Sequence, residues 1–215
     1  MLSTFIKAFS NLRTDKNRNR YPVLTKHRAP HKPLLLLSVM DLIAQGQITT
    51  SFIEPSLELL ETFNTYFARI MPPGSTTSMA YPFSRLSTDG FWERIPKAGY
   101  DAGTQYNVSS MKRLREMYYG ARMDEALFQL LCDSETRERL RAVLIDTYFA
   151  PEVRWVLLEQ GQVNYEAYEY SRRLIADPDA GFEESEAKRG PVRDQGFRKA
   201  IVSLYRHRCA LCGIR

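Results

Sequence analysis

Cys209 and Cys212, near the end of the chain, form a C-x-x-C pair. This spacing is typical of two thiolates that bind one zinc ion, and a structural zinc ion takes four ligands. The pair can therefore supply only half of a zinc site. Because the chain ends three residues after Cys212, we expect the other ligands to lie beyond it; a cysteine pair that binds no metal is the alternative.

Cationic side chains gather in a second place, the basic segment from Arg13 to Lys32. This segment holds seven Lys or Arg residues against a single acidic residue, Asp15. Clustered cations favour a nucleic-acid partner, because contact with the phosphate backbone releases condensed counterions. A smaller cluster at Lys112, Arg113 and Arg115 points the same way. A solvated basic loop is the alternative for the first segment.

Aromatic side chains are frequent in the stretch Y-P-F-S-R-L-S-T-D-G-F-W, residues 81–92. Asp-Gly is a strong signal for a hairpin turn, so we predict a two-stranded ribbon with its tip at Asp89 and Gly90. Tyr81 and the rigid ring of Pro82 can offer apolar CH surface to a ligand. The alternative is that these aromatic residues only fill the core.

The composition suits a protein with a real hydrophobic core. Hydrophobic residues make up 44% of the 215 residues, and the net charge is +5. No apolar run approaches the length of a membrane span, and the first residues lack the features of a secretory signal. Three cysteines do not form a disulfide framework. We therefore expect a cytoplasmic protein.

Hydrophobic periodicity predicts a mainly α-helical fold with a small β-hairpin, in the α+β class. Pro33 and Gly46 should begin and end a central helix, a strand is expected at residues 48–50, and Cys132 should fill the core. Helices are predicted over residues 2–12, 33–45, 55–70, 109–123, 123–149 and 151–176, the fourth with a serine N-cap.

A change in composition marks a boundary after these helices. Residues 177–195 are polar and rich in acids, Gly and Pro, as linkers are. An amphipathic helix with Phe197, Ile201 and Leu204 on one face then leads into the cysteine pair. We predict a domain over residues 1–175, a linker over 176–192, and the start of a second domain over 193–215.

The closing stretch R-D-Q-G-F-R-K-A-I-V-S-L-Y-R-H-R-C-A-L-C-G-I-R resembles the opening of an HNH endonuclease domain of the bacterial restriction type. The resemblance implies a second zinc-ligand pair, a catalytic histidine and Mg²⁺ ligands, all beyond Arg215. His207 precedes the cysteine pair and lies outside the motif, so no catalytic residue is assigned. We expect this chain to be inactive as a nuclease, and the complete protein to be a DNA endonuclease with structural zinc and a divalent ion such as Mg²⁺.

The first domain also resembles a known family. The blocks R-A-P-H-K-P-L-L-L-L-S-V-M-D-L-I-A-Q-G-Q-I and Y-P-F-S-R-L-S-T-D-G-F-W are similar to the sulfur-binding domain of phosphorothioate-dependent type IV restriction endonucleases, often placed before an HNH nuclease. The similarity covers about residues 1–175, and the stretch 99–112 matches least clearly. It implies double-stranded DNA with phosphorothioate linkages as the partner, in antiphage defence.

The resemblance also implies site residues. Tyr81 and Pro82 would contact the sulfur, while His31 and Lys32 would hold the phosphate that carries it. The implied DNA-binding set also contains Arg28, Arg85, Ser109, Ser110 and Lys112, and the basic segment should contact phosphates through Lys16, Arg18 and Arg20. Alternatively, His31 and Lys32 only begin a helix, and Arg85 points into solvent.

Two other functions fit the same residues. A ribbon after a helical core with basic flanks is also compatible with a winged-helix-like reader of unmodified or base-modified DNA. The second alternative is a protein-interaction module of an antiphage system, with F-E-E-S-E-A-K-R-G as its tether. Competition between a phosphorothioate duplex and its unmodified counterpart separates these hypotheses.

Overall fold

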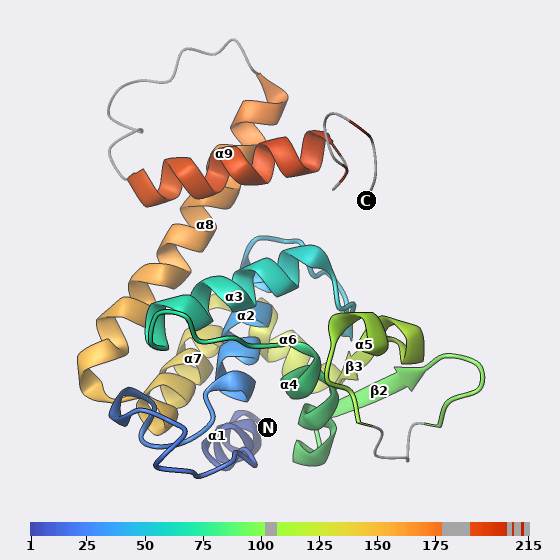
Figure 1. Ribbon diagram of the computed structural model, residues 1–215, viewed down its shortest axis with the longest axis vertical. Coiled ribbons are helices and arrows are strands. Elements are labelled where there is room, and N and C mark those ends of the chain that lie inside the picture. The colour runs from blue at the N-terminus through green and yellow to red at the C-terminus, as the bar shows by residue number, and fades with distance from the viewer. Residues whose placement is uncertain (102–106, 178–189, 206–207, 209–211, 213–215) are drawn as a thin grey trace. The chain divides into compact units, whose positions relative to one another are not determined.

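The protein is described by a computed structural model that covers residues 1–101, 107–177, 190–205, 208 and 212. It forms two compact units, Met1–Leu157 and Leu158–Arg215. The helices are α1 (Leu2–Ser10), α2 (His31–Ala44), α3 (Leu57–Ile70), α4 (Ala80–Arg85), α5 (Met111–Met117), α6 (Glu125–Cys132), α7 (Ser134–Tyr148), α8 (Arg154–Ala176) and α9 (Gly190–Leu204). The strands are β1 (Phe52–Ile53), β2 (Trp92–Pro96) and β3 (Tyr118–Met123), and 3-10 turns cover Val23–Thr25, Leu86–Asp89 and Pro151–Val153. The predicted class, mainly α with a small β part, is confirmed (Figure 1).

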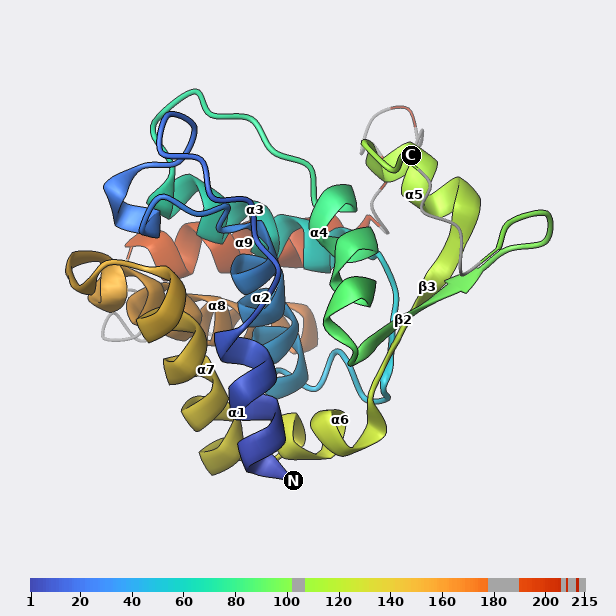
Figure 2. The same cartoon turned by 90° about the horizontal axis from the view of Figure 1, so that it is seen from below.

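Helix α2 lies in the core of the first unit because nearly all its faces are apolar. Every residue from Lys32 to Ile43 is buried, and α3, α4, α6 and α7 pack against it, while α1 lies beside α7 (Figure 2). Pro33 lies in the first turn, where its missing N–H leaves no bond unmade. Gly46 follows the helix with a φ of 68°, a left-handed conformation that glycine adopts without strain. Both predicted ends of the helix are therefore close to the observed ones.

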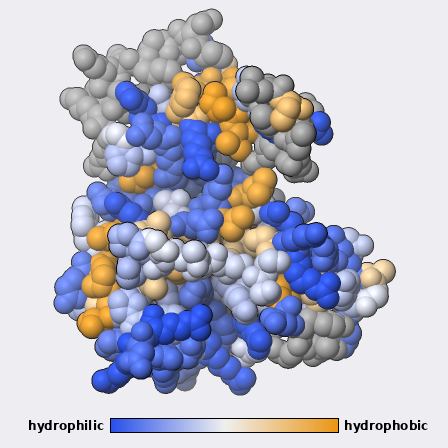
Figure 3. Space-filling view, viewed as in Figure 1, coloured by the Kyte–Doolittle hydropathy of each residue, from blue (hydrophilic) through white to orange (hydrophobic). Residues whose placement is uncertain are grey.

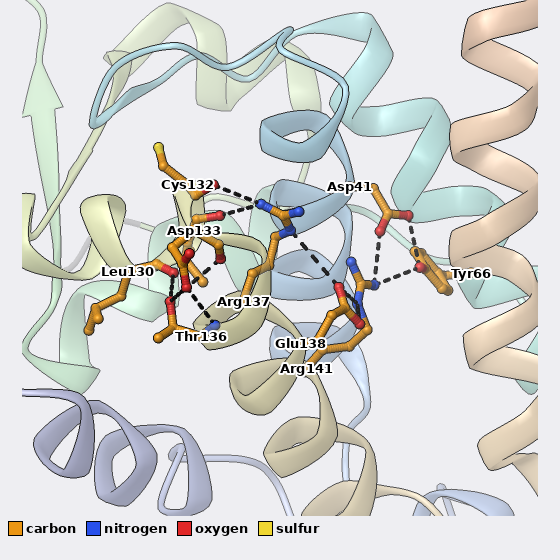
Figure 4. A network of polar contacts seen from close by, with 10 residues as sticks. Asp41, Tyr66, Leu130, Cys132, Asp133, Thr136, Arg137, Glu138 and Arg141 are labelled. Atoms are coloured by element: carbon orange, nitrogen blue, oxygen red, sulfur yellow. Dashed lines mark hydrogen bonds and ion pairs between the residues drawn. The ribbon is translucent and has the colours of Figure 1, made fainter.

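A buried polar network joins three helices of this core. Arg141 of α7 pairs with Asp41 of α2 at 2.9 Å, and the hydroxyl of Tyr66 in α3 donates to the other Asp41 oxygen at 2.8 Å (Figure 4). Glu138 binds the Nε of Arg141 at 3.1 Å. Burial alone would lower the pKa of Arg141, but Asp41 and its neighbours outweigh it, so the net direction is upward. Arg141 therefore stays charged, and its contacts with Asp41 and Tyr66 join the three helices.

The small sheet has the strand order β1-β3-β2, with both pairs antiparallel. Gly120 lies where β3 passes closest to β1. A Cβ at this position would lie 2.4 Å from the carbonyl oxygen of Ile53 and 2.8 Å from the ring of Phe52. Only glycine allows the two strands this approach.

The predicted hairpin at residues 81–92 is wrong. Ala80–Arg85 is a helix, Leu86–Asp89 a 3-10 turn, and only Trp92–Pro96 is a strand. Ala80, Phe83 and Leu86 are fully buried at a helical spacing of three, so packing overrides the local turn signal. Gly90, with a φ of 87°, ends the 3-10 turn instead of forming the tip of a ribbon.

Three smaller predictions are also wrong. The strand expected at residues 48–50 lies at Phe52–Ile53. Tyr118–Met123, predicted as the end of a helix, forms the central strand β3, because it pairs with both β1 and β2. Cys132 is exposed at the end of α6 and does not fill the core.

The N-cap of α5 is as predicted: the Ser110 hydroxyl accepts from the backbone N–H of Arg113 at 3.2 Å.

In the second unit, α9 packs closely against α8. A Cβ at Gly196 would lie 2.8 Å from the carbonyl oxygen of Ala167, and the side-chain amide of Gln195 donates to Asn164 at 2.8 Å. The predicted helix before the cysteine pair is present, and its apolar residues Phe197, Ile201 and Leu204 are exposed. Most of the predicted linker lies outside the described residues, and the predicted domain boundaries stay a prediction.

Candidate functional site

Three segments that are distant in the sequence meet at the N-terminus of α2. The ammonium of Lys32 binds the carboxylate of Asp89 at 2.5 Å and donates to the hydroxyl of Thr88 at 3.2 Å. The other Asp89 oxygen accepts the backbone N–H of Arg13 at 2.8 Å. One carboxylate thus joins α2, the turn after α4 and the start of the basic segment.

The pKa of Lys32 depends on its burial and on the charges around it. Burial lowers the pKa of the Lys32 ammonium, Asp89 opposes this shift, and Arg13 and Arg85 lower the pKa further. Arg13 and Arg85 are both exposed, and the backbone N–H of Arg13 is bound to Asp89. Because Lys32 is buried and paired with Asp89, the exposed positive charges beside this pair belong to Arg13 and Arg85.

His31 is a neutral residue at this site. Its ring lies between those of Tyr21 and Phe67, with centroid distances of 6.3 and 5.4 Å. Burial, helped by the charge of Arg20, lowers the pKa of His31 to about 4. At neutral pH it can offer a phosphate one ring N–H but no positive charge.

Hydrogen bonds hold the backbone of the basic segment in place. The backbone N–H of Ala29 donates to the carbonyl of Asp15 at 2.8 Å, and the hydroxyl of Tyr21 donates to the Asp15 carboxylate at 3.2 Å. The Tyr148 hydroxyl accepts the N–H of Leu12 at 2.7 Å. The three cations predicted to contact phosphates, Lys16, Arg18 and Arg20, are exposed on this fixed backbone.

Two other cations of the segment are used within the protein. Lys26 donates to the carbonyls of Asp146 and Thr147 at the C-terminus of α7, where a positive charge is favourable. Lys26 and the next residue, His27, have positive φ angles of 49° and 56°, which are strained for side chains with a Cβ. The turn places the Arg28 guanidinium 5.9 Å from the ring centroid of Tyr148.

Helix α4 presents one aromatic and one cationic side chain on its exposed face. Tyr81 is 45% exposed, and Arg85 follows it by four residues, one turn of the helix. Phe83 is fully buried, with its ring edge-on to Trp92 at 5.1 Å. Pro82, predicted to contact sulfur beside Tyr81, is buried, so Tyr81 offers the larger accessible surface; both sulfur contacts stay predictions.

The remaining predicted residues belong to α5, which contacts α4. Ser109 and Lys112 are exposed, whereas the hydroxyl of Ser110 already caps the helix. Much of the predicted reading loop before them, residues 102–106, lies outside the described residues. The structure therefore places α5 beside α4, and in the described part of the chain no hydrogen bond or ion pair joins Lys112 to the Lys32–Asp89 pair.

Sequence reasoning missed Asp89 and Arg13 as members of the site. Asp89 was assigned to a hairpin tip because the Asp-Gly signal is local, and nothing in the sequence marks its pairing with Lys32. Arg13 was counted in the basic segment but not separated from the other cations. Its distinguishing feature, a backbone N–H bound to Asp89, exists only in the folded chain.

The described part of the chain contains neither a group of residues that could hold a metal ion nor a helix that could span a membrane. Cys212 is exposed, while Cys209 and His207 lie outside the described residues. Among the residues that are described, no group of three or more His, Cys, Asp or Glu side chains could hold a metal ion. No described helix combines the length and apolar character needed to cross a membrane.

A comparison with protein families identifies one match. The family model described as ScoMcrA-like, DNA sulfur-binding domain matches residues 2–164, which include every element from α1 to α7. A search of curated proteins found no match for the chain.

Proposed function

Because the chain belongs to the family of ScoMcrA-like DNA sulfur-binding domains, whose partner is DNA, we propose that it recognises phosphorothioate-modified duplexes at the α2–α4 site. In this proposal Tyr81 offers an apolar surface to the sulfur. Arg13 and Arg85 hold the phosphate that carries the sulfur, and Lys32 and Asp89 fix their positions.

The chemistry of sulfur explains how such a surface could select it. A phosphorothioate replaces one non-bridging oxygen by sulfur, which is larger and more weakly hydrated. Burying it against a ring contributes about as much as burying one methylene, ~0.8 kcal/mol. A phosphate oxygen at the same place loses its hydrogen bonds, at a cost of about 1–3 kcal/mol. Together these terms give a preference of roughly tenfold to several hundredfold.

The observation that carries the proposal is the exposed face of α4. Tyr81 and Arg85, one helical turn apart, place a ring and a guanidinium side by side. A phosphorothioate needs both, because one of its atoms prefers apolar contact while its charge needs a cation. Helix α4 packs against α2, and Thr88, in the turn that follows Arg85, accepts a hydrogen bond from Lys32 at 3.2 Å, so this face lies near the N-terminus of α2.

The basic segment supplies binding that does not depend on sulfur. Lys16, Arg18 and Arg20 are exposed on a backbone that hydrogen bonds hold in place. Such contacts fix a protein on a duplex but carry no sequence information. We propose that they provide affinity for DNA in general, and that the α4 face provides the selectivity.

The wider context is also part of the proposal. We infer that this reader belongs to a modification-dependent HNH endonuclease, since residues 193–215 resemble the opening of an HNH domain. Cys209 and Cys212 would supply two of the four ligands of its structural zinc. They cannot close the site themselves, so zinc content well below one per chain is expected for residues 1–215 as a monomer.

Binding to matched duplexes tests the proposal. One duplex carries a single stereodefined phosphorothioate and the other is unmodified, and fluorescence anisotropy gives both affinities. We expect the wild-type protein to prefer sulfur at least tenfold, and Tyr81→Ala to lose most of that preference while retaining salt-dependent binding to the unmodified duplex. Tyr165→Ala is the matched control, since Tyr165 is 47% exposed in α8. Equal wild-type affinities for both duplexes would refute the proposal.

A further inference from the structure

A second group of cations and rings lies in the first unit, outside the site on α2 and α4. It consists of Lys97, Tyr100, Lys112, Arg113 and Tyr119, and is called here the Tyr119 surface. These residues come from the segment after β2, from α5 and from the start of β3. Figure 3 shows a strongly hydrophilic patch over α5.

Tyr119 lies at the surface, unlike the residues on either side of it in β3. It is 58% exposed, whereas Tyr118 and Gly120 on either side are buried. The Lys97 ammonium lies 5.3 Å from the centroid of the Tyr119 ring. The backbone N–H of Lys97 donates to the carbonyl of Met117 at 2.8 Å, so the chain holds this cation beside the ring.

The same combination occurs a second time in α5. The Arg113 guanidinium lies 5.7 Å from the ring centroid of Tyr100 and donates to its hydroxyl at 3.5 Å. Arg113 also pairs with Glu116 at 3.4 Å on the exposed side of the helix. The backbone N–H of Tyr100 donates to the carbonyl of Lys97 at 3.1 Å, so the two rings, each with a cation beside it, belong to adjoining segments.

The Tyr119 surface carries a net positive charge, and hydrogen bonds anchor its helix, α5. Residues 97–119 contain four Lys or Arg and two acidic residues. The guanidinium of Arg115 donates twice to the carbonyl of Pro55, at 3.1 and 3.0 Å, and so anchors α5. Within the described part of the chain, Lys112 has no hydrogen-bond or ion-pair partner and is exposed.

We propose that the Tyr119 surface binds the sugar–phosphate backbone of the duplex at linkages without sulfur. The Tyr119 ring packs on a deoxyribose, while Lys97, Lys112 and Arg113 bind neighbouring phosphates. A nucleic acid fits better than a protein partner, because lysine is depleted from protein–protein interfaces, whereas phosphate contacts depend on it.

The place of α5 in the fold supports a single duplex that spans both regions. Helix α5 contacts α4, which carries Tyr81 and Arg85. Axes of packed helices lie roughly 8–10 Å apart, which equals the rise of about three base pairs. The inference rests on the proposed function in one respect: the site on α4 sets where the duplex lies.

The test compares variants on three duplexes. One is long with a single phosphorothioate, one is its unmodified match, and one is short, with only about two base pairs on either side of the sulfur. Lys97→Gln should weaken binding to both long duplexes by roughly three- to tenfold and reduce the log–log salt slope by about one. The preference for sulfur should not change, and the short duplex should show a smaller loss.

Substitutions of Tyr119 separate ring from charge. Tyr119→Ala should lose affinity on both long duplexes, whereas Tyr119→Phe keeps the ring and should bind as the wild type does. Trp155→Ala is the control for an exposed aromatic residue, since Trp155 is 68% exposed in α8. If Tyr119→Ala weakens the fold in thermal melts, Lys97→Gln alone decides.

The outcomes of these binding measurements distinguish a failure of the inference from a failure of the proposed function. Unchanged binding of Lys97→Gln and Tyr119→Ala to both long duplexes overturns the inference, and so does a loss confined to the sulfur-bearing duplex, which would place the residues in the sulfur site. A wild-type protein without sulfur preference refutes the proposed function alone. Equal losses on both long duplexes would still support the Tyr119 surface in that case.

Discussion

The Asp41–Arg141 pair and the Lys32–Asp89 pair are both buried, yet their surroundings differ. Around Asp41 and Arg141, the other partners are Tyr66 and Glu138, and all four residues belong to helices. Around Lys32 and Asp89, the partners are a turn hydroxyl and the backbone of the basic segment. One network joins regular elements, and the other joins loops to the N-terminus of α2.

The difference teaches what each pair contributes. The first network joins α2, α3 and α7, so its contribution is the relative placement of three helices. The second pair allows Lys32, Arg13 and Arg85 to lie near one another, because Asp89 offsets one of the three charges. A buried ion pair can thus serve the core or prepare a site, and its neighbours decide which.

The largest expected effect is on the core pair. Arg141→Ala leaves Asp41 and Tyr66 without their cation, which should destabilise the fold by about 3–5 kcal/mol. The melting temperature should fall by roughly 6–20 °C, as differential scanning calorimetry can measure. The preference of the folded protein for sulfur should not change.

A double variant is the control for this prediction. Asp41→Leu combined with Arg141→Met replaces the pair by apolar side chains of similar size and should recover much of the lost stability. If the single variant instead lost sulfur preference at full stability, the core network would be coupled to the site and the comparison would fail.

The next largest effect is a dependence of stability on pH, which His31 at the candidate site should cause. The pKa of His31 is lowered to about 4 in the folded state, against about 6.5 in the unfolded chain. Above pH 6.5 the residue is neutral in both states and costs nothing. As the pH falls from 6.5 to 4, the unfolded chain binds the proton first, so stability should fall by up to about 3 kcal/mol.

Urea denaturation at a series of pH values measures this loss. His31→Gln removes the titrating group and should flatten the curve between pH 6.5 and 4. A wild-type curve as flat as that of the variant would show that the His31 ring protonates without penalty, contrary to its burial between two aromatic rings.

Asp89→Asn should have a smaller effect on stability and a distinct effect on binding. It removes the charge that offsets Lys32 but keeps a hydrogen-bonding side chain, so a loss of about 1–3 kcal/mol is expected. With one more uncompensated cation, binding to the unmodified duplex should hold or strengthen, and the preference for sulfur should fall. Anisotropy with both duplexes gives the ratio, and an unchanged ratio would mean that Asp89 is only structural.

The smallest effect separates two cations of the basic segment. Lys16→Gln should leave stability unchanged and reduce the salt slope of DNA binding by about one. Lys26→Gln should do the reverse, because Lys26 binds the end of α7; it should cost about 0.3–2 kcal/mol of stability and leave the slope intact. Equal salt slopes for the two variants would contradict the assignment.

The sequence predicted features that depend on composition and periodicity. The run of leucines after Pro33 marks α2 as a core helix, and Ser110 marks the start of α5, because both signals act within one turn of helix. The cations of the basic segment are likewise visible as charges. These features require no knowledge of distant partners.

The features that the sequence missed depend on distant partners. Asp89 and Gly90 carry a hairpin signal, but Asp89 is paired with Lys32, fifty-seven residues earlier. The strand Tyr118–Met123 follows a helix directly, and only its pairing with β1 and β2 makes it a strand. The contact of Lys26 with the end of α7 is equally hidden, because the sequence shows only the charge of this residue.

Gly120 has a consequence in genetic terms. Every missense change at its codon adds at least a Cβ, and that atom would meet the carbonyl of Ile53 and the ring of Phe52. No amino-acid replacement at this position is therefore silent for the pairing of β1 with β3. The proposed backbone-binding surface around Tyr119, the residue before Gly120, would share this constrained backbone.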